Sequence, residues 1–387
     1  MDRTHPQAEH SISTGLPLPD SLLEEMDSTP QNPRYHAEGS VLKHTELVLK
    51  AYQEHRHRFE LDSQDHEVLY WAAILHDVGK PSTTRWENER WRAKGHERAG
   101  VPIARDFLLT QPQISAYQRK RILDLVRYHA VPLQWGLHPR ALPFYYRLAT
   151  RTDLRMVGIF GYFDIVGRYC ENKKGVMNMV DRFVQELVPR IEYEMGTYAQ
   201  VQECYRKASL RHKNALWYSL RQEDAQLLLK LINADTAADT LPQFHCVIPV
   251  GADSPQLRHF LDQEYPGHKR YDAARLDPAR QGKFDLETQL RPLKHFVSVY
   301  GQAQKSLLFT GLPIDDDLRT TVANYCRQHG GAVEFVLFEE RLESLLAEEK
   351  EKVEADRIRD QHRRLLVPHP WGAHRLRLAS ERDLGEN

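Results

Sequence analysis

The stretch "WAAILHDVGKPSTT", residues 71–84, indicates the fold class of the N-terminal half of this chain. A run of small and apolar residues ends at the adjacent pair His76 and Asp77, and Gly79 and Pro81 follow. Glycine and proline end helices, so the pair stands at a helix end. Imidazole and carboxylate groups are both metal ligands. Placed side by side, they supply one terminal ligand and one carboxylate that can bridge two ions.

Apolar residues recur at three- and four-residue spacing on both sides of this stretch, which predicts an all-α bundle over residues 34–200. The segments are "VLKHTELVLKAYQ", "EVLYWAAILHD", "AGVPIARDFLL", "RKRILDLVRYH" and "DRFVQELVPRIE". Residues 1–33, with five prolines among polar residues, are expected to form a loosely ordered leader. Residues 201–243 are expected to form a helical connector.

From residue 244 to 387 the pattern changes to short β-rich runs that alternate with helical stretches such as "DDLRTTVANYCRQHG". The β-rich runs are "FHCVIPVG", "HFVSVYG", "SLLFTG" and "AVEFVLFE". This alternation predicts a parallel sheet with crossover helices, so the chain is expected to be multidomain, with an α-helical domain followed by an α/β domain.

Composition limits the functional classes. A chain of 387 residues favours two domains, and a net charge of −1 gives no general sign of a nucleic-acid binder. Four scattered cysteines indicate reduced thiols, and there is neither an apolar run long enough to span a membrane nor a signal peptide, so we expect a cytoplasmic protein. The 20 histidines are numerous, and histidine is the commonest metal ligand.

Four further residues offer the same ligand chemistry in the helical half: His44, His96, His129 and Asp164. A single histidine on an apolar helix is more often a hydrogen-bonded core residue than a ligand. The sequence "DVG" is also compatible with a plain helix end capped by Gly79. Spacing alone does not decide between these interpretations.

The order of these residues, with "YHAEGSVLKHT", "HDVGKPSTT", "GHERAG", "RYHAVP" and "FDIVGR", resembles the HD-domain superfamily of metal-dependent phosphohydrolases. It is similar in detail to HD domains attached to RNA-repair and tRNA nucleotidyltransferase enzymes. The resemblance implies an all-α fold. It also implies core metal ligands His44, His76, Asp77 and Asp164, with His96 and His129 as the extra ligands of two-metal members.

The resemblance further implies the roles of the site. Two divalent ions, Mn, Ni, Co, Fe or Zn, would be bridged by Asp77 and would activate a water for attack on phosphorus. Lys80, the basic residue after the motif, would lie near the phosphate and offset its charge. Arg168, in "FDIVGR", is expected to bind substrate as well. Asp77 and Lys80 are therefore the expected catalytic residues.

The segment "TTRWENERWRAKGHER", residues 83–98, offers a clue to the substrate. It interleaves Trp86 and Trp91 with basic residues, a mixture that stacks bases and follows the backbone of single-stranded nucleic acid. The expected substrate-binding residues here are Arg85, Arg90, Arg92 and Lys94. The alternative is a short hairpin turning at 87–89, with both tryptophans packed inward and the arginines solvated.

The segment order of the α/β half resembles the P-loop polynucleotide kinase module of HD-kinase RNA end-healing proteins, with "YDAAR" at the position of that family's D-x-x-R motif (Asp272 and Arg275). However, Gln256, Leu257 and Arg258 stand where a P-loop has Gly, Lys and Ser or Thr. We therefore expect a degenerate, kinase-like domain with no bound nucleotide cofactor and no ATP hydrolysis. An unrelated α/β domain is the alternative.

The sequence thus predicts a phosphohydrolase that removes a 2′,3′-cyclic phosphate or 2′-phosphate from RNA ends. Its second domain would bind RNA or a partner such as an RNA ligase or another repair protein. One alternative is an HD nucleotidase or phosphodiesterase acting on free or cyclic nucleotides. The other is a pseudoenzyme scaffold in an RNA-repair assembly.

Overall fold

The computed structural model describes residues 15–234, 242–273, 286–312, 316–346, 352–365, 369 and 375–378. The chain divides into two compact units, each of which is described by itself. The first comprises residues 1–111, 117–139 and 155–186, and the second comprises residues 112–116, 140–154 and 187–387. This division differs from a contiguous helical domain over 34–200, since residues 112–116, 140–154 and 187–200 belong to the second unit. No helix in the described part of the chain has both the length and the apolar character needed to cross a membrane.

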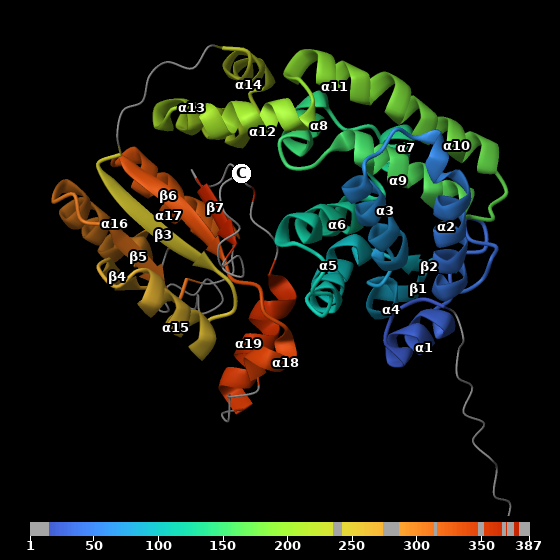
Figure 1. Ribbon diagram of the computed structural model, residues 1–387, viewed down its shortest axis with the longest axis horizontal. Coiled ribbons are helices and arrows are strands. Elements are labelled where there is room, and N and C mark those ends of the chain that lie inside the picture. Colours follow the sequence, from blue (N-terminus) through green and yellow to red (C-terminus); the bar gives the residue numbers. More distant parts are fainter. Residues whose placement is uncertain are drawn as a thin grey trace, which may run out of the picture. The chain divides into compact units, whose positions relative to one another are not determined.

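The first unit is helical, as the periodicity predicts (Figure 1). Its helices are α1 (Asp20–Ser28), α2 (Val41–His55), α3 (Ser63–Leu75), α4 (Lys80–Thr83), α5 (His96–Leu108), α6 (Ala116–Tyr128), α7 (Val131–Leu137), α9 (Leu154–Val166) and α10 (Lys173–Arg182). A 3-10 turn, Arg56–Arg58, follows α2. The expectation of a loose leader over 1–33 is wrong for α1, whose Leu23 and Met26 are buried. Residues 1–14 lie outside the described residues.

Side-chain caps set where α2 and α3 begin. The Ser40 hydroxyl accepts a hydrogen bond from the Lys43 amide, and the Asp62 carboxylate accepts one from the Asp65 amide. Each cap satisfies an amide that has no partner within the helix. The buried faces of α2 and α3 then pack together, and this packing brings His44 near the end of α3.

A β-hairpin lies between α4 and α5, and it consists of β1 (Thr84–Glu87) and β2 (Arg90–Ala93). Its two turn residues, Asn88 and Glu89, both have positive φ, as a tight two-residue hairpin turn requires. The alternative interpretation of this segment as a hairpin is therefore correct. Its second part is wrong for Trp86, which is 59 % exposed.

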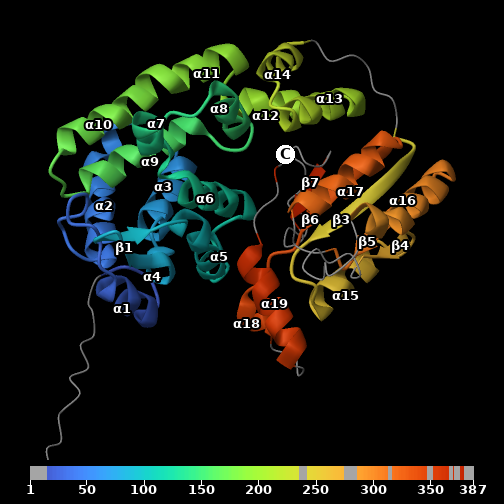
Figure 2. The ribbon, with the colours of Figure 1, turned by 180° about the vertical axis from the view of Figure 1, so that it is seen from behind.

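The second unit combines helices with one sheet (Figure 2). Its helices before the sheet are α8 (Leu142–Ala149), α11 (Val188–Met195), α12 (Tyr198–Lys207), α13 (Leu210–Arg221) and α14 (Ala225–Ile232). A π-helical turn, Phe183–Leu187, lies at the boundary between the units. The helix α8 packs with α11 and α14, which explains why residues 140–154 belong to this unit.

The sheet has five parallel strands in the order β4-β5-β3-β6-β7. The strands are β3 (Phe244–Val250), β4 (Lys269–Asp272), β5 (Leu307–Thr310), β6 (Gly331–Leu337) and β7 (Arg375–Leu378). The accompanying helices are α15 (Pro255–Glu264), α16 (Leu286–Gln302), α17 (Asp316–Gln328), α18 (Leu342–Leu346) and α19 (Lys352–Arg364). The predicted parallel sheet with crossover helices is thus confirmed.

Alternate residues of β3 face the two sides of the sheet. Cys246 and Ile248 pack with α16 and α17, whereas Val247 packs with α15. The β-rich segment "HFVSVYG" is not a strand but lies within α16. Burial of Val297 against the sheet outweighs the local β-propensity of this segment.

Candidate metal centre

Six side chains that lie on or next to five helices converge in the first unit. His44 lies on α2, His76 and Asp77 follow α3, His96 begins α5, His129 follows α6, and Asp164 lies near the end of α9. All of them are buried except His96, which is partly exposed. The structure therefore brings together all six residues that the family resemblance assigns to metal binding.

In each of the four imidazoles, the Nδ1 atom lies near an oxygen that can accept its proton. The Nδ1 atoms of His76, His96 and His129 lie 3.1, 2.7 and 2.9 Å from the carbonyl oxygen three residues earlier in the chain. The Nδ1 atom of His44 lies 2.9 Å from the Glu38 carboxylate. Each acceptor favours the tautomer with the proton on Nδ1, which leaves Nε2 with a lone pair that can bind a metal.

The two oxygens of Asp77 face different pairs of histidines. His44 Nε2 and His76 Nε2 lie 3.7 and 3.2 Å from Oδ2. His96 Nε2 and His129 Nε2 lie 3.3 and 3.8 Å from Oδ1. Ligand atoms therefore gather in two groups that share Asp77, which is the arrangement expected of a bridging carboxylate.

Unpaired buried atoms test whether these residues suit a metal. Among the described residues, both ring nitrogens of His44, Nε2 of His76 and both Asp77 oxygens are buried without a hydrogen bond of good geometry, although His44 Nδ1 lies 2.9 Å from the Glu38 carboxylate. Such atoms cost about 1–3 kcal/mol each when left unsatisfied. In the tautomers assigned above, the Nε2 lone pairs of His96 and His129 face each other at 3.2 Å, an arrangement that repels unless a cation is shared. The donor set fits one or two divalent ions.

The protonation states of Asp77 and His129 are those that a metal ligand requires. Burial raises the pKa of Asp77, but His76 and Lys80 together hold it well below its usual value. Burial, followed by the neighbouring charges of His96 and His76, lowers the pKa of His129 to about 4. Near neutral pH, Asp77 is therefore a carboxylate and His129 a neutral imidazole, the forms that bind metal.

Two glycines permit the close backbone approaches that gather the ligands. A Cβ on Gly79 would lie 2.2 Å from the His96 carbonyl oxygen and 2.4 Å from the Gly100 amide. A Cβ on Gly167 would lie 2.6 Å from the Val48 amide. Gly79 has φ −86°, so its role is close packing against α5 and not a left-handed helix cap.

Two cationic side chains border the ligands. Lys80 Nζ lies 2.6 Å from Asp77 Oδ2 and donates to Gln31 Oε1, also at 2.6 Å. Arg168 donates to both oxygens of Asp164 at 2.8 and 2.7 Å, and Asp164 in turn lies 3.0 Å from His44 Nε2. Both cations line a cavity of about 200 Å³ that opens onto Asp77, His96 and His129.

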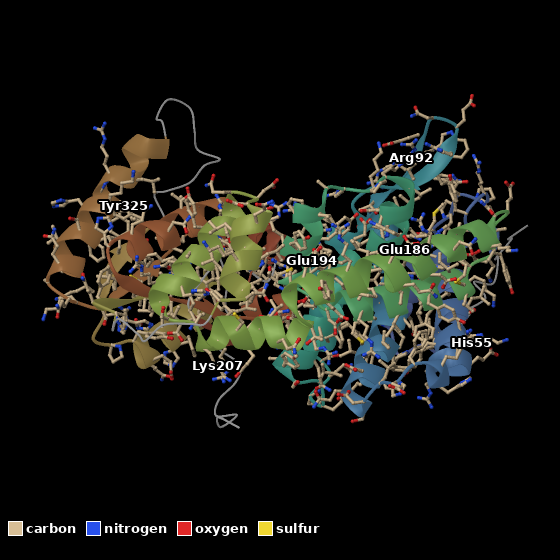
Figure 3. All side chains as sticks on the ribbon, turned by 90° about the horizontal axis from the view of Figure 1, so that it is seen from above. His55, Arg92, Glu186, Glu194, Lys207 and Tyr325 are labelled. Carbon is tan, nitrogen blue, oxygen red and sulfur yellow. The ribbon has the colours of Figure 1, made fainter. Side chains whose placement is uncertain are left out.

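The predicted substrate-binding residues of the hairpin do not all reach this region. Arg92 lines the metal-centre cavity, and Arg90, Arg92 and Lys94 line a neighbouring one. Arg85 lines neither cavity and donates to the carbonyls of Thr84 and Ser82. Figure 3 labels Arg92 among the hairpin side chains, on the opposite side of the first unit from His55.

Sequence reasoning missed Glu38, whose side chain is buried between two histidines. Its Oε1 lies 2.8 Å from His36 Nδ1 and 2.9 Å from His44 Nδ1, and its Oε2 accepts from the Tyr169 amide. Burial raises the pKa of Glu38, but hydrogen bonds from His36 and His44 hold it well below its usual value. A carboxylate six positions before a histidine gives no periodic signal, so only the structure identifies this partner.

Residues 41–155 match the family model described as HD domain. These residues contain five of the six candidate ligands, and Asp164 lies beyond them. The match supports the resemblance to the HD superfamily, whose members are in general metal-dependent phosphohydrolases. No curated protein and no solved structure matches the chain.

Proposed function

We propose that this chain is a metal-dependent phosphohydrolase that removes a 2′,3′-cyclic phosphate or 2′-phosphate from RNA ends. The observation that carries the hydrolase part is the convergence of His44, His76, His96 and His129 on the two oxygens of one buried aspartate. The RNA part rests on the basic and aromatic hairpin beside that site. The basic side chains suit a nucleic-acid backbone, and the tryptophans suit bases.

The ligands would form two groups around Asp77. His44, His76 and Asp164 would hold one ion, and His96 and His129 the other. When bound, the ions supply a water activated near neutral pH and positive charge for the phosphoryl oxygens.

The remaining residues orient the ligands and contact the phosphate. Lys80, fixed between Asp77 and Gln31, would neutralise charge on the phosphoryl group. Arg168 would hold Asp164 in position with one amino group and direct the rest of its guanidinium toward the substrate. Glu38 would keep the Nε2 lone pair of His44 directed at the metal.

We infer a kinase-like but non-catalytic role for the sheet of the second unit. The loop after its central strand β3 leads into α15, where a phosphate-binding domain holds its anion. Here Asp253 occupies that loop, and Arg258 donates to both of its oxygens at 2.9 Å. Because this loop carries a carboxylate that is already paired with an arginine, we infer that the sheet does not support phosphoryl transfer and instead binds RNA or a partner.

A panel of substrates and metals tests this proposal. The substrates are RNA ending in a 2′,3′-cyclic phosphate, a 2′-phosphate or a 3′-phosphate, together with 2′,3′-cyclic mononucleotides and dNTPs, each with Mn, Ni, Co or Mg. We expect the highest kcat/KM on cyclic-phosphate or 2′-phosphate RNA ends. Higher kcat/KM on free nucleotides would instead favour the nucleotidase, and no hydrolysis with any metal would favour the scaffold.

A further inference from the structure

A second cavity of about 630 Å³ adjoins the metal centre in the first unit, and we call it the outer groove. It is lined by parts of residues 32–36, 90–94 and 168–179 and by α7. It shares His36, Trp91 and Arg168 with the metal-centre cavity, so the two are continuous. Its volume is within the range of small-molecule sites.

One part of the outer groove is apolar yet open to solvent. Leu133 and Leu137 of α7 line it together with Val176 and Met179 of α10. Leu137 is 56 % exposed and Tyr35, which also lines it, is 41 % exposed. Apolar and aromatic surface in a concave site favours a flat, partly hydrophobic ligand group.

The charge of the outer groove is one-sided. Five cationic side chains line it, Arg34, Arg90, Arg92, Lys94 and Arg168, against the single carboxylate of Glu171. Lys94 pairs with Glu87 and Arg168 with Asp164. Across the part of the chain that the structure describes, the guanidinium groups of Arg34, Arg90 and Arg92 form no ion pair with a carboxylate. These three charges are available to an anionic ligand.

We propose that the outer groove binds the nucleotide next to the scissile phosphate, with its base against Tyr35 and Leu137 and its further phosphate near Arg34 and Arg90. An apolar wall suits a base, and unpaired guanidinium groups suit a phosphate. A phosphate ester without a base would leave the apolar residues of the groove exposed to water. This inference rests on the proposed function and narrows it to substrates that carry a base and a further phosphate next to the scissile phosphate.

Binding to the metal-free chain tests the groove without hydrolysis. The probe is a fluorescein-labelled single-stranded RNA hexamer in excess EDTA, followed by anisotropy. Tyr35→Ala should raise Kd about fivefold or more, the lower end of what one stacked base contributes, whereas Tyr35→Phe should stay near the wild-type Kd. Leu137→Asn should raise Kd, and Leu137→Met should not.

Arg34→Ala and Arg90→Ala should each flatten the slope of log K against log salt by about 0.7, the contribution of one phosphate contact on a single strand. Lys50→Ala is the matched control, because it removes an exposed charge from α2 outside both cavities. Its salt slope and Kd should equal those of the wild type.

Hydrolysis then distinguishes this inference from the proposed function. We expect a dinucleotide ending in a 2′,3′-cyclic phosphate to have a lower KM than the same molecule with an abasic 3′ ribose. Equal KM values, with Tyr35→Ala and Leu137→Asn binding RNA like Lys50→Ala, would overturn the groove and leave the hydrolase standing. RNA binding that depends on Tyr35 in a protein that hydrolyses nothing would overturn the hydrolase and leave the groove standing.

Discussion

Two aspartates at the ends of regular elements, one in each unit, have opposite surroundings. Asp77 follows α3, is 1 % exposed, and has carboxylate oxygens that face four imidazole nitrogens and one lysine. Asp253 follows β3, and Arg258 contacts both of its oxygens while Arg357 contacts one of them at 3.3 Å. The second aspartate is neutralised by arginines of its own unit.

The different surroundings of Asp77 and Asp253 indicate which of the two loops would be stabilised by a bound ligand. Around Asp77, more lone pairs than protons converge, so an added cation lowers the free energy of the site. Around Asp253, the Gln361 side chain also accepts from the backbone amide, and Arg357 donates to the carbonyl. Local hydrogen bonds therefore satisfy the second loop without a phosphate.

Replacing each aspartate by alanine tests the difference between the two loops most directly. Asp77→Ala should lose both ions and reduce hydrolysis by more than about 100-fold, beyond the 10–100-fold cost of losing an outer-shell partner. Asp253→Ala should keep the metal content and hydrolysis rate of the wild type. Elemental analysis and hydrolysis of bis(p-nitrophenyl) phosphate measure both. Wild-type activity in Asp77→Ala would eliminate the assigned metal centre.

Glu38→Ala tests the metal centre more gently than Asp77→Ala, because it removes only the partner of one candidate ligand. Without that carboxylate, His44 loses the acceptor for its Nδ1 proton, so metal affinity should fall about 10–100-fold. Competition with a chromogenic chelator measures this affinity. Glu46→Ala, which disrupts the exposed pair with Lys43 on the same helix, is the control and should keep wild-type affinity. Equal affinities in the two variants would contradict the role of Glu38.

Gly79→Ala tests whether close backbone packing positions the second group of ligands. The added Cβ would clash with the first turn of α5, so we expect the free energy of unfolding to fall by about 1–3 kcal/mol. Metal content should fall toward one ion, since His96 begins that helix. Urea denaturation and elemental analysis measure both effects. Gly100→Ala should cost less, because its Cβ contacts are 3.3 Å or longer.

The pH dependence of the metal-free protein tests His129. Its folded pKa of about 4 lies below the ordinary 6.5, so the unfolded chain binds the proton more readily. Stability should therefore fall as pH drops from about 6.5 to about 4. His129→Gln should make this fall shallower, as measured by urea midpoints in EDTA. An unchanged slope would show that other groups dominate the window.

The smallest expected effect is none at all. Neither the wild type nor Asp253→Ala should transfer labelled phosphate from ATP to 5′-OH RNA with any divalent metal, because Leu257 is buried under the sheet and Arg258 pairs with Asp253. Gel analysis of the RNA measures this. Detectable transfer would overturn the interpretation of the second unit as non-catalytic.

The helical bundle could be predicted because a helix with one buried face repeats its apolar residues every 3.6 positions. The parallel sheet could be predicted because β-rich segments that alternate with helical segments form parallel strands joined by crossover helices. The convergence of the six candidate ligands between residues 44 and 164 could be expected from the motif resemblance, and not from their spacing. Arg275 of the expected D-x-x-R lies outside the described residues, while Asp272 ends β4.

Other features depend on contacts distant in sequence. The segment around Val297 favours a strand locally, but packing against the sheet makes it helical. Leu133 and Leu137 indicate only a helix face in the sequence, yet the fold places both along a groove, where Leu137 is exposed. Arg85 and Arg92 are cross-strand partners, and only Arg92 lines the cavities. The residue composition of one strand does not show which of two cross-strand partners reaches a cavity.

The carbonyl partners of His76, His96 and His129 have an evolutionary consequence. Each acceptor belongs to the main chain three residues earlier, so no side-chain mutation can delete it. Among these four histidines, only His44 has the side chain of another residue, Glu38, as the acceptor beside its Nδ1 atom. A substitution at Ala73 in α3, Ala93 in β2 or Val126 in α6 therefore leaves the carbonyl acceptor in place, whereas a single codon change at Glu38 removes the acceptor of a candidate ligand.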